Sequence, residues 1–266
     1  MHLIAAAQMV STADKSHNLD SAARLVRRAA DLGARLVGLP ENFSWMGPEE
    51  ERASAAETLD GPSLSRMAEL ARERKVTLLA GSILEQGAPG GRFYNTTVVF
   101  GPDGSRLAVY RKMHLFDVDV GDGKPYRESA AVAPGNEVVV ADTEVGRLGL
   151  SICYDLRFPE LYRRLATGGA TLLAVPAAFT LMTGKDHWEV LLRARAIENQ
   201  CYLFAPAQGA ALGPARHLGP CHGGGPLGPV TARASEGEGL AVAAMDTELL
   251  ARVRRNLPCL QHRRLE

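Results

Sequence analysis

The sequence predicts an α/β protein with a mixed sheet or a pair of sheets. Short apolar runs alternate along the chain with stretches whose apolar residues recur at helical spacing. Two extended runs flank a turn rich in Gly, Pro and Asp at residues 101–105, which is typical of an antiparallel hairpin. With 266 residues and 46% hydrophobic content, the chain can build a large core. No linker stands out, so we expect one domain over residues 1–266.

The first half of the chain alternates between strand and helix. Residues 3–10 form a continuous apolar run, as expected of a strand buried on both faces. Leu19, Ala22 and Val26 recur at helical spacing among arginines, and Gly33 ends that helix. The other elements expected here are strands at 35–39 and 76–80, a helix at 64–75, and the hairpin strands at 93–100 and 106–110.

The second half continues this alternation and ends in a polar tail. Pro159 suits the first turn of a helix, where a missing N–H is tolerated. From Leu249 onward the chain is basic and polar, and we expect no core there. The expected elements are strands at 138–141, 148–152, 171–175, 202–207 and 240–245, and helices at 158–166 and 188–199.

Charge and cysteine content exclude several classes of partner. Lys+Arg and Asp+Glu both number 30, so nothing points to nucleic acid or to an anionic membrane surface. No apolar run approaches the roughly 20 residues that span a bilayer, and the first ten residues do not resemble a signal peptide. Cys153, Cys201, Cys221 and Cys259 form no CxxC pair, so we expect free thiols in the cytoplasm.

Three reactive side chains follow predicted strands. Glu41, Lys112 and Cys153 each come directly after, or close to, the end of an apolar run. Taken singly, they would be interpreted as a solvated carboxylate, a surface charge and an inert buried thiol. Because ligands bind at the carboxyl ends of strands in α/β proteins, the three together favour a catalytic site.

These residue types suit the hydrolysis of an amide. A thiolate is a good nucleophile for a poor electrophile, which assigns attack to Cys153. Glu41 is the general base that takes the thiol proton; it would later return a proton to the leaving ammonia and then activate water. Lys112 and the backbone N–H of Tyr154 would stabilise the oxyanion, and the ammonium would also favour the thiolate. No His is needed as a base.

Three motifs resemble the signatures of the nitrilase superfamily of carbon–nitrogen hydrolases. They are Leu-Pro-Glu-Asn at 39–42, Tyr-Arg-Lys-Met-His-Leu at 110–115, and Ile-Cys-Tyr-Asp-Leu-Arg-Phe-Pro-Glu at 152–160. The resemblance implies a four-layer α-β-β-α sandwich, a homodimer or higher homo-oligomer, and neither cofactor nor metal. It also matches Glu128 to a further glutamate that positions Lys112 and substrate. The alternative for Glu128 is an exposed loop carboxylate.

Residues 176–199 resemble one branch of that superfamily. This branch comprises the Nit1-type amidases, which hydrolyse deaminated glutathione, and the ω-amidases, which hydrolyse α-ketoglutaramate. Both substrates are carboxylate-bearing 2-oxo acid amides, and Arg157 could bind such a carboxylate or instead form a salt bridge with Glu160. Phe179 and His187 are further candidates for supporting the substrate. A true nitrilase, an N-carbamoyl amidase and a non-catalytic binding subunit remain alternatives.

A metal site near His187 is the tempting alternative in this region. The sequence His-Trp-Glu at 187–189 supplies two residue types that ligate metals, but HExxH is absent. Trp188 is spaced like a residue of a helix core face. We therefore expect no metal.

Residues 219–228 depart from the superfamily pattern. The chain reads Gly-Pro-Cys-His-Gly-Gly-Gly-Pro-Leu-Gly where the superfamily has a Gly–His pair, an apolar strand and Asp-Pro-Trp-Gly. Three consecutive glycines make a poor strand, so we expect a loose segment. Codons for Pro220 to Gly228, read one base out of frame, can encode His-Val-Met-Val-Val-Asp-Pro-Trp-Gly. A compensated frameshift and a real divergence are both open, and the frameshift would remove Cys221-His222 as a metal candidate.

Overall fold

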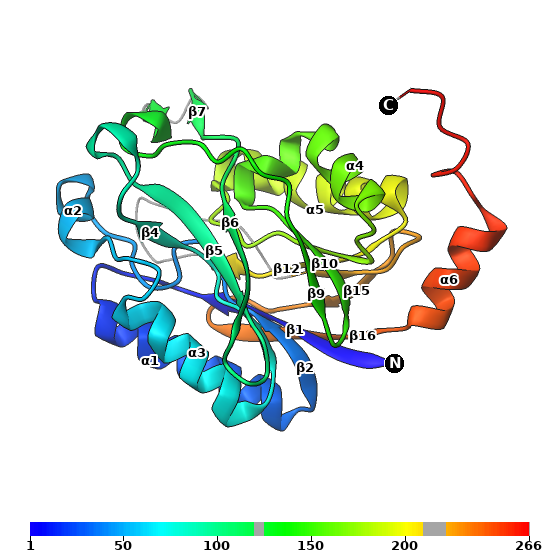
Figure 1. Cartoon of the computed structure of the whole chain (residues 1–266), viewed down its shortest axis with the longest axis horizontal. Helices are drawn as coiled ribbons and strands as arrows, with labels where there is room; N and C mark the ends of the chain where they lie inside the picture. Colours follow the sequence, from blue (N-terminus) through cyan, green and yellow to red (C-terminus); the bar gives the residue numbers. More distant parts are fainter. Residues whose placement is uncertain (120–124, 210–221, 266) are drawn as a thin grey trace.

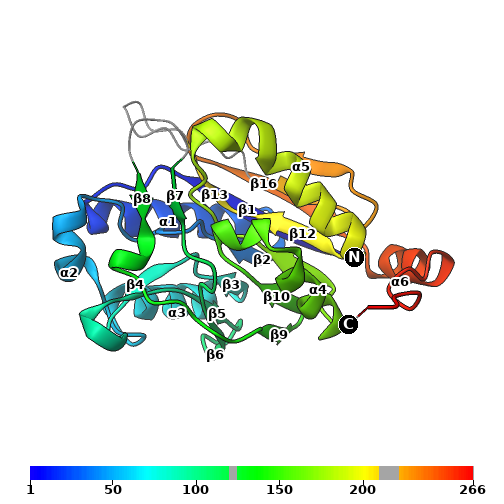
Figure 2. The ribbon, with the colours of Figure 1, turned by 90° about the horizontal axis from the view of Figure 1, so that it is seen from above.

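Two sheets pack face to face, and helices cover the outer face of each (Figures 1 and 2). The computed structural model describes residues 1–119, 125–209 and 222–265. The predicted α/β class and the implied α-β-β-α layering are confirmed. The chain forms a pair of sheets rather than one mixed sheet.

The first sheet has eight strands, and its centre is parallel. Strand β1 pairs in parallel with β2 and antiparallel with β16, while β5 and β6 form the predicted antiparallel hairpin. Its strands are β1 (His2–Met9), β2 (Ala34–Gly38), β3 (Thr77–Leu79), β4 (Ile83–Glu85), β5 (Tyr94–Phe100), β6 (Arg106–Arg111), β13 (Ala207–Gln208) and β16 (Gly239–Met245).

The second sheet has six strands, of which β10, β11 and β12 run parallel. Strands β7 and β8 pair with each other and form a separate two-stranded ribbon. The strands are β7 (Asp117–Val118), β8 (Tyr126–Arg127), β9 (Val140–Thr143), β10 (Gly146–Leu150), β11 (Leu172–Ala174), β12 (Tyr202–Ala205), β14 (His222–Gly224) and β15 (Val230–Arg233).

Helices α1 and α3 cover the first sheet, and α4 and α5 cover the second (Figure 2). The side chain of Asp14 accepts the His17 N–H at 3.0 Å and so begins α1. The helices are α1 (Lys15–Asp31), α2 (Arg52–Ala55), α3 (Pro62–Arg74), α4 (Pro159–Thr167), α5 (Leu181–Asn199) and α6 (Thr247–Asn256), with short 3-10 turns at Glu49–Glu51, Pro89–Gly91, Glu128–Ala130 and Cys153–Arg157. No helix in these described ranges is long and apolar enough to cross a membrane.

Apolar side chains fill the space between the layers. Leu36 and Val99 of the first sheet and Leu148 of the second belong to one buried cluster, which continues through the second sheet to residues of α4 and α5. The outer face of the first sheet packs in a second cluster with α1 and α3. Both faces of the central strands are therefore buried, which explains their continuous apolar sequence.

The expectation of a tail without a core was wrong, because residues 247–256 form helix α6. The Asp246 side chain accepts the backbone N–H groups of Glu248 and Leu249 and caps the helix. Leu250 and Val253 are buried on its inner face. Arg252 and Arg255 are exposed on the outer face, so overall composition concealed an amphipathic helix.

The expectation of a loose glycine-rich segment was wrong for residues 222–224. They form β14, which pairs with both β12 and β15; residues 219–221, including Cys221, lie outside the described part. The N–H and C=O groups of a glycine can form the hydrogen bonds of a sheet although the residue has no side chain, so these residues can still form a strand. Gly223 and Gly224 line a small apolar hollow with Leu192, Ala196, Leu203 and Val230.

Replacing Gly224 by Val should stabilise the protein. A Cβ at Gly224 would approach only the carbonyl oxygens of Pro229 at 3.8 Å and Leu203 at 3.9 Å, and its φ is not positive. Strand propensity then favours Val by up to about 1 kcal/mol, a rise in Tm of roughly 2–4 °C for a protein of this size. Gly237→Val is the control and should destabilise, because Gly237 has a φ of +81°. Thermal unfolding measures both, and an unchanged or lower Tm for Gly224→Val would contradict the expectation.

Candidate active site

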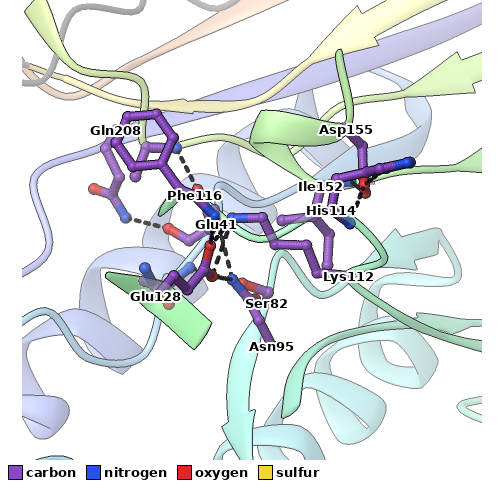
Figure 3. Close-up of polar contacts among 12 residues, drawn as sticks. Glu41, Ser82, Asn95, Lys112, His114, Phe116, Glu128, Ile152, Asp155 and Gln208 are labelled. Atoms are coloured by element: carbon purple, nitrogen blue, oxygen red, sulfur yellow. Dashed lines mark hydrogen bonds and ion pairs between the residues drawn. The ribbon is translucent and has the colours of Figure 1, made fainter. Parts of the chain in front are cut away.

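Glu41, Lys112 and Cys153 lie together between the two sheets, and Figure 3 shows Glu41 and Lys112 with the polar side chains around them. Glu41 and Lys112 follow β2 and β6 of the first sheet, whereas Cys153 follows β10 of the second. All three are buried, with 3%, 2% and 8% of their surfaces exposed. Lys112 Nζ lies 3.0 Å from Glu41 Oε1, and the Cys153 thiol is close enough for the charges of Glu41 and Lys112 to act on it. The structure thus brings together the three residues that the sequence analysis selected.

Cys153 occupies a constrained turn. Its φ is +48°, in the left-handed region that a residue with a Cβ seldom adopts, and it begins a 3-10 turn. Its N–H donates to the Pro176 carbonyl at 2.9 Å. Such strain persists only where the surroundings hold it, and it is frequent at functional sites.

Glu41 is held as a carboxylate by its contacts. Oε1 accepts from Lys112 Nζ and, at 2.8 Å, from Asn95 Nδ2, while Oε2 accepts the Ala178 N–H at 2.8 Å. Burial by itself raises the pKa of Glu41. The Lys112 charge and the hydrogen bonds of Cys153, Lys112 and Ala178 outweigh burial, so the pKa lies below its ordinary value. Glu41 therefore rests as a carboxylate, the form that has a free lone pair for a proton.

Lys112 is held as an ammonium between two carboxylates. Its Nζ lies 2.9 Å from Glu128 Oε2 and 3.0 Å from Glu41 Oε1. Burial lowers the pKa of Lys112, but the charges of Glu128 and Glu41 raise it well above its ordinary value. Glu128 also accepts the Phe116 N–H at 2.6 Å, so it lies against the site rather than in an exposed loop.

The Cys153 side chain rests as a neutral thiol. Burial and the Glu41 charge raise the pKa of Cys153 well above its ordinary value, and Lys112 lowers it by less. The Lys112 ammonium favours the thiolate, as expected from the sequence, but its effect on the pKa of Cys153 is smaller than the opposing effects of burial and Glu41.

Sequence reasoning missed two polar residues that support the cluster. Asn95 donates through Nδ2 to Glu41 and, at 3.3 Å, to Glu128. Gln208 Nε2 donates to the Glu41 carbonyl at 2.9 Å. Each lies at the end of a strand made mostly of apolar and Thr residues. An amide side chain in such a strand was the signal that the sequence offered. The alternation of side chains along a strand shows which face the amide lies on, but not which residues of other strands it contacts.

A small hollow leads to the Cys153 sulfur. Arg157 lies at its edge, with its guanidinium 5.1 Å from the Phe179 ring centroid and 5.9 Å from that of Tyr154. Arg157 Nη1 is 3.1 Å from His187 Nδ1. Within the described ranges no ion pair joins Arg157 to Glu160. The lining residues are Phe116, Cys153, Tyr154, Ala178, Phe179, Thr180 and Thr183.

The described residues contain no group of three or more His, Cys, Asp or Glu side chains arranged to hold a metal ion. Trp188 has 1% of its surface exposed and its ring centroid is 4.9 Å from that of Phe179. Trp188 therefore lies on the face of α5 that packs against the core, as its helical spacing predicted.

The carbon–nitrogen hydrolase family model matches residues 3–255 of this chain. The chain belongs to the carbon–nitrogen hydrolase family. It is 46% identical to a deaminated glutathione amidase from Synechocystis sp., over 98% of both chains. It is 40% identical to the human omega-amidase NIT2, covering 98% of this chain and 94% of that one.

A solved structure agrees with this assignment. Saccharomyces cerevisiae Nit3, described as a member of branch 10 of the nitrilase superfamily, superposes with a TM-score of 0.89 at 32% identity, covering 99% of this chain and 97% of that chain. This carbon–nitrogen hydrolase therefore has the nitrilase-superfamily fold and belongs to the enzymes that hydrolyse carbon–nitrogen bonds other than peptide bonds.

Proposed function

We propose that this carbon–nitrogen hydrolase is an amidase that cleaves a carboxylate-bearing 2-oxo acid amide, deaminated glutathione, through an acyl-enzyme on Cys153. The observation that carries this proposal is the buried set of thiol, carboxylate and ammonium at Cys153, Glu41 and Lys112. The 46% identity to a relative named for that substrate supports the choice of amide.

The first half of the reaction forms the acyl-enzyme. Sγ of Cys153 bonds to the amide carbon while the thiol proton passes to Glu41. The carbonyl oxygen becomes negative and is stabilised by the Lys112 ammonium and by the Tyr154 N–H. The carbon–nitrogen bond then breaks, and Glu41 returns its proton to the leaving amine or ammonia.

The second half releases the acid. Water adds to the thioester carbon and gives a proton to Glu41, and the oxyanion forms again beside Lys112. The carbon–sulfur bond breaks and the sulfur recovers the proton from Glu41. Glu128 takes no proton in this scheme. It holds the Lys112 ammonium in position through its two oxygens, at 3.1 and 2.9 Å.

Arg157 and His187 are proposed to recognise the substrate carboxylate. The Arg157 guanidinium lies on aromatic rings at the edge of the hollow and has the planar fork that binds carboxylates bidentately. Tyr154 and Phe179 would shape the passage to Cys153. The 40% identity to an omega-amidase favours α-ketoglutaramate as the second candidate substrate.

A substrate panel tests the proposal. The full-length protein is incubated with deaminated glutathione, α-ketoglutaramate, a neutral amide, a nitrile and an N-carbamoyl amino acid, and released ammonia or primary amine is measured. The highest kcat/KM should be for a 2-oxo acid amide. Preference for the nitrile or the carbamoyl compound would assign the enzyme to another activity of the family, and no turnover at all would favour a non-catalytic binding subunit.

Replacing Arg157 by Ala should raise KM for deaminated glutathione by roughly ten- to a hundredfold. A charge-assisted hydrogen bond contributes about 1.5–3 kcal/mol, which corresponds to that factor. The neutral amide provides the control, because its KM should change little. An equal rise in KM for both substrates would contradict carboxylate binding by Arg157 and indicate a structural role.

We also propose that the chain acts as one domain over residues 1–266 and assembles as a homodimer in the cytoplasm, where Cys153 stays reduced. Met182, Val190 and Ile197 support the assembly, because they lie on one side of α5 and expose 48%, 65% and 47% of their surfaces. We propose that a second copy of the chain packs against these exposed apolar side chains. Sedimentation of the full chain tests this, and a monomer mass at micromolar concentration would contradict it.

A further inference from the structure

Asp155 is a buried carboxylate whose two oxygens are fully used. It has 0% of its surface exposed. Oδ2 accepts the Ile152 N–H at 2.8 Å and the Tyr110 hydroxyl at 2.6 Å. Oδ1 accepts the His114 N–H at 3.0 Å and lies 2.7 Å from His114 Nδ1 (Figure 3). Because an ionised carboxylate only accepts, Nδ1 carries the ring proton.

These donors flank two of the reacting groups. Ile152 directly precedes Cys153, whereas Tyr110 and His114 lie two residues before and two residues after Lys112. The Lys112 segment leaves the first sheet and the Cys153 turn leaves the second. One carboxylate therefore ties together the two backbone segments that carry the cation and the nucleophile.

Asp155 also closes the strained turn at Cys153. Its own N–H donates to the Ile152 carbonyl at 3.0 Å while its side chain accepts the Ile152 N–H. This pair of bonds encloses Cys153, whose φ of +48° needs such support. On the other side, the His114 ring stacks on Phe158 with centroids 3.7 Å apart and planes 7° from parallel, so the ring cannot swing away.

We propose that Asp155 is a positioning residue that sets the separation between the Lys112 ammonium and the Cys153 sulfur. The inference rests on the proposed roles of Lys112 and Cys153. An oxyanion forming on the amide carbon must reach Lys112 while that carbon bonds to sulfur, and a misplacement of about 1 Å lowers such rates by around 10²-fold.

The charge environment of Asp155 supports a role beyond stabilising the fold. In the described ranges its only ion-pair partner is His114, and no Lys or Arg reaches it. A buried carboxylate without a firm counter-ion is costly, and an apolar side chain would fill the same space at lower cost. Burial and the Asp155 charge raise the pKa of Tyr110 well above its ordinary value, so Tyr110 keeps the proton that it donates.

The test removes donors from Asp155 and leaves its charge in place. His114→Leu deletes the ring N–H at similar size, and His114→Asn restores an N–H near the position of Nδ1. We expect kcat on deaminated glutathione to fall roughly tenfold or more in His114→Leu, with KM changed less than about threefold, and to recover largely in His114→Asn. Tyr110→Phe should behave like His114→Leu and provides the test if His114→Leu does not fold.

Tyr202→Phe is the matched control for Tyr110→Phe. It also loses a buried phenol, but at the capping site of α6, where the Tyr202 hydroxyl donates to the Asp246 carbonyl and accepts the Asp246 N–H, both at 3.1 Å. Its Tm should fall by a similar amount to that of Tyr110→Phe while its kcat stays within about twofold of the unmodified enzyme. If kcat falls equally in Tyr202→Phe and Tyr110→Phe, the loss of activity is explained by general destabilisation and not by the contact of Tyr110 with Asp155.

A second measurement does not depend on the substrate. Alkylation of Cys153 by iodoacetamide, followed by mass spectrometry of its peptide, should slow in His114→Leu and Tyr110→Phe but not in His114→Asn or Tyr202→Phe. Equal values for His114→Leu and His114→Asn, in both kcat and alkylation, would overturn the role of Asp155. Activity that survives Cys153→Ala would instead overturn the proposed mechanism, so the two failures are distinguishable.

Discussion

Replacing Cys153 by Ala is expected to abolish turnover and leave the fold intact. Among the described cysteines it alone contacts Glu41 and Lys112, so no other thiol there can form the acyl-enzyme. Cys201 is buried in the core, where burial raises its pKa to about 11. Loss of one sulfur atom from a turn held by backbone hydrogen bonds should change Tm little. Amine or ammonia release should drop to the uncatalysed rate.

Cys201→Ala is the control for this variant. Cys201 is also buried and its Sγ lies 3.2 Å from the Ala170 carbonyl oxygen, away from the Glu41–Lys112 cluster. Its activity should be nearly normal, although its Tm should fall through loss of packing. If Cys153→Ala releases product at a similar rate to the unmodified enzyme, covalent catalysis through Cys153 is wrong.

Glu41→Gln should lower kcat by a factor on the order of 10² or more, the scale of a lost general base. The amide keeps the size of Glu41 and can still accept from Lys112, but it cannot take the thiol proton. Because the Glu41 charge raises the pKa of Cys153, its removal should lower that pKa. The pH midpoint of Cys153 alkylation should therefore move down while turnover falls.

Glu57→Gln is the matched control for Glu41→Gln. Glu57 is another buried glutamate paired with a lysine, Lys15, but it lies beside α3, where it accepts the Ser63 N–H at 2.9 Å. Its substitution should lower Tm and leave kcat within about twofold. Near-normal turnover in Glu41→Gln, or an upward shift of the alkylation midpoint, would remove Glu41 from the role of base.

Lys112→Met would remove the charge shared by two buried carboxylates, so its activity and its stability must be measured together. Glu41 and Glu128 would face each other without a counter-ion, and their repulsion would disturb the site. Lys112 is therefore a less direct test of oxyanion stabilisation than Glu41 is of base catalysis.

The elements with a clear hydrophobic period were predictable from local sequence. The hairpin of β5 and β6 and the helices α1 and α3 appear within a few residues of their expected positions. Helix α6 was missed because its basic outer face dominated the composition, although Asp246 and the spacing of Leu250 and Val253 marked it. Strand β14 was missed because glycines carry no period, while both neighbouring strands supply backbone partners.

The sequence by itself determined the candidate residues, since the types and order of Glu41, Lys112 and Cys153 already favoured a thiol-dependent hydrolase. Only the tertiary structure decided how they act. Packing of two sheets brings a cation and a base from one sheet to a thiol on the other, and Asp155 joins the segments that hold them. The protonation state of Cys153 follows from burial and from the competing charges of Glu41 and Lys112. Both depend on distances between residues far apart in the chain, and a local pattern contains no such distances.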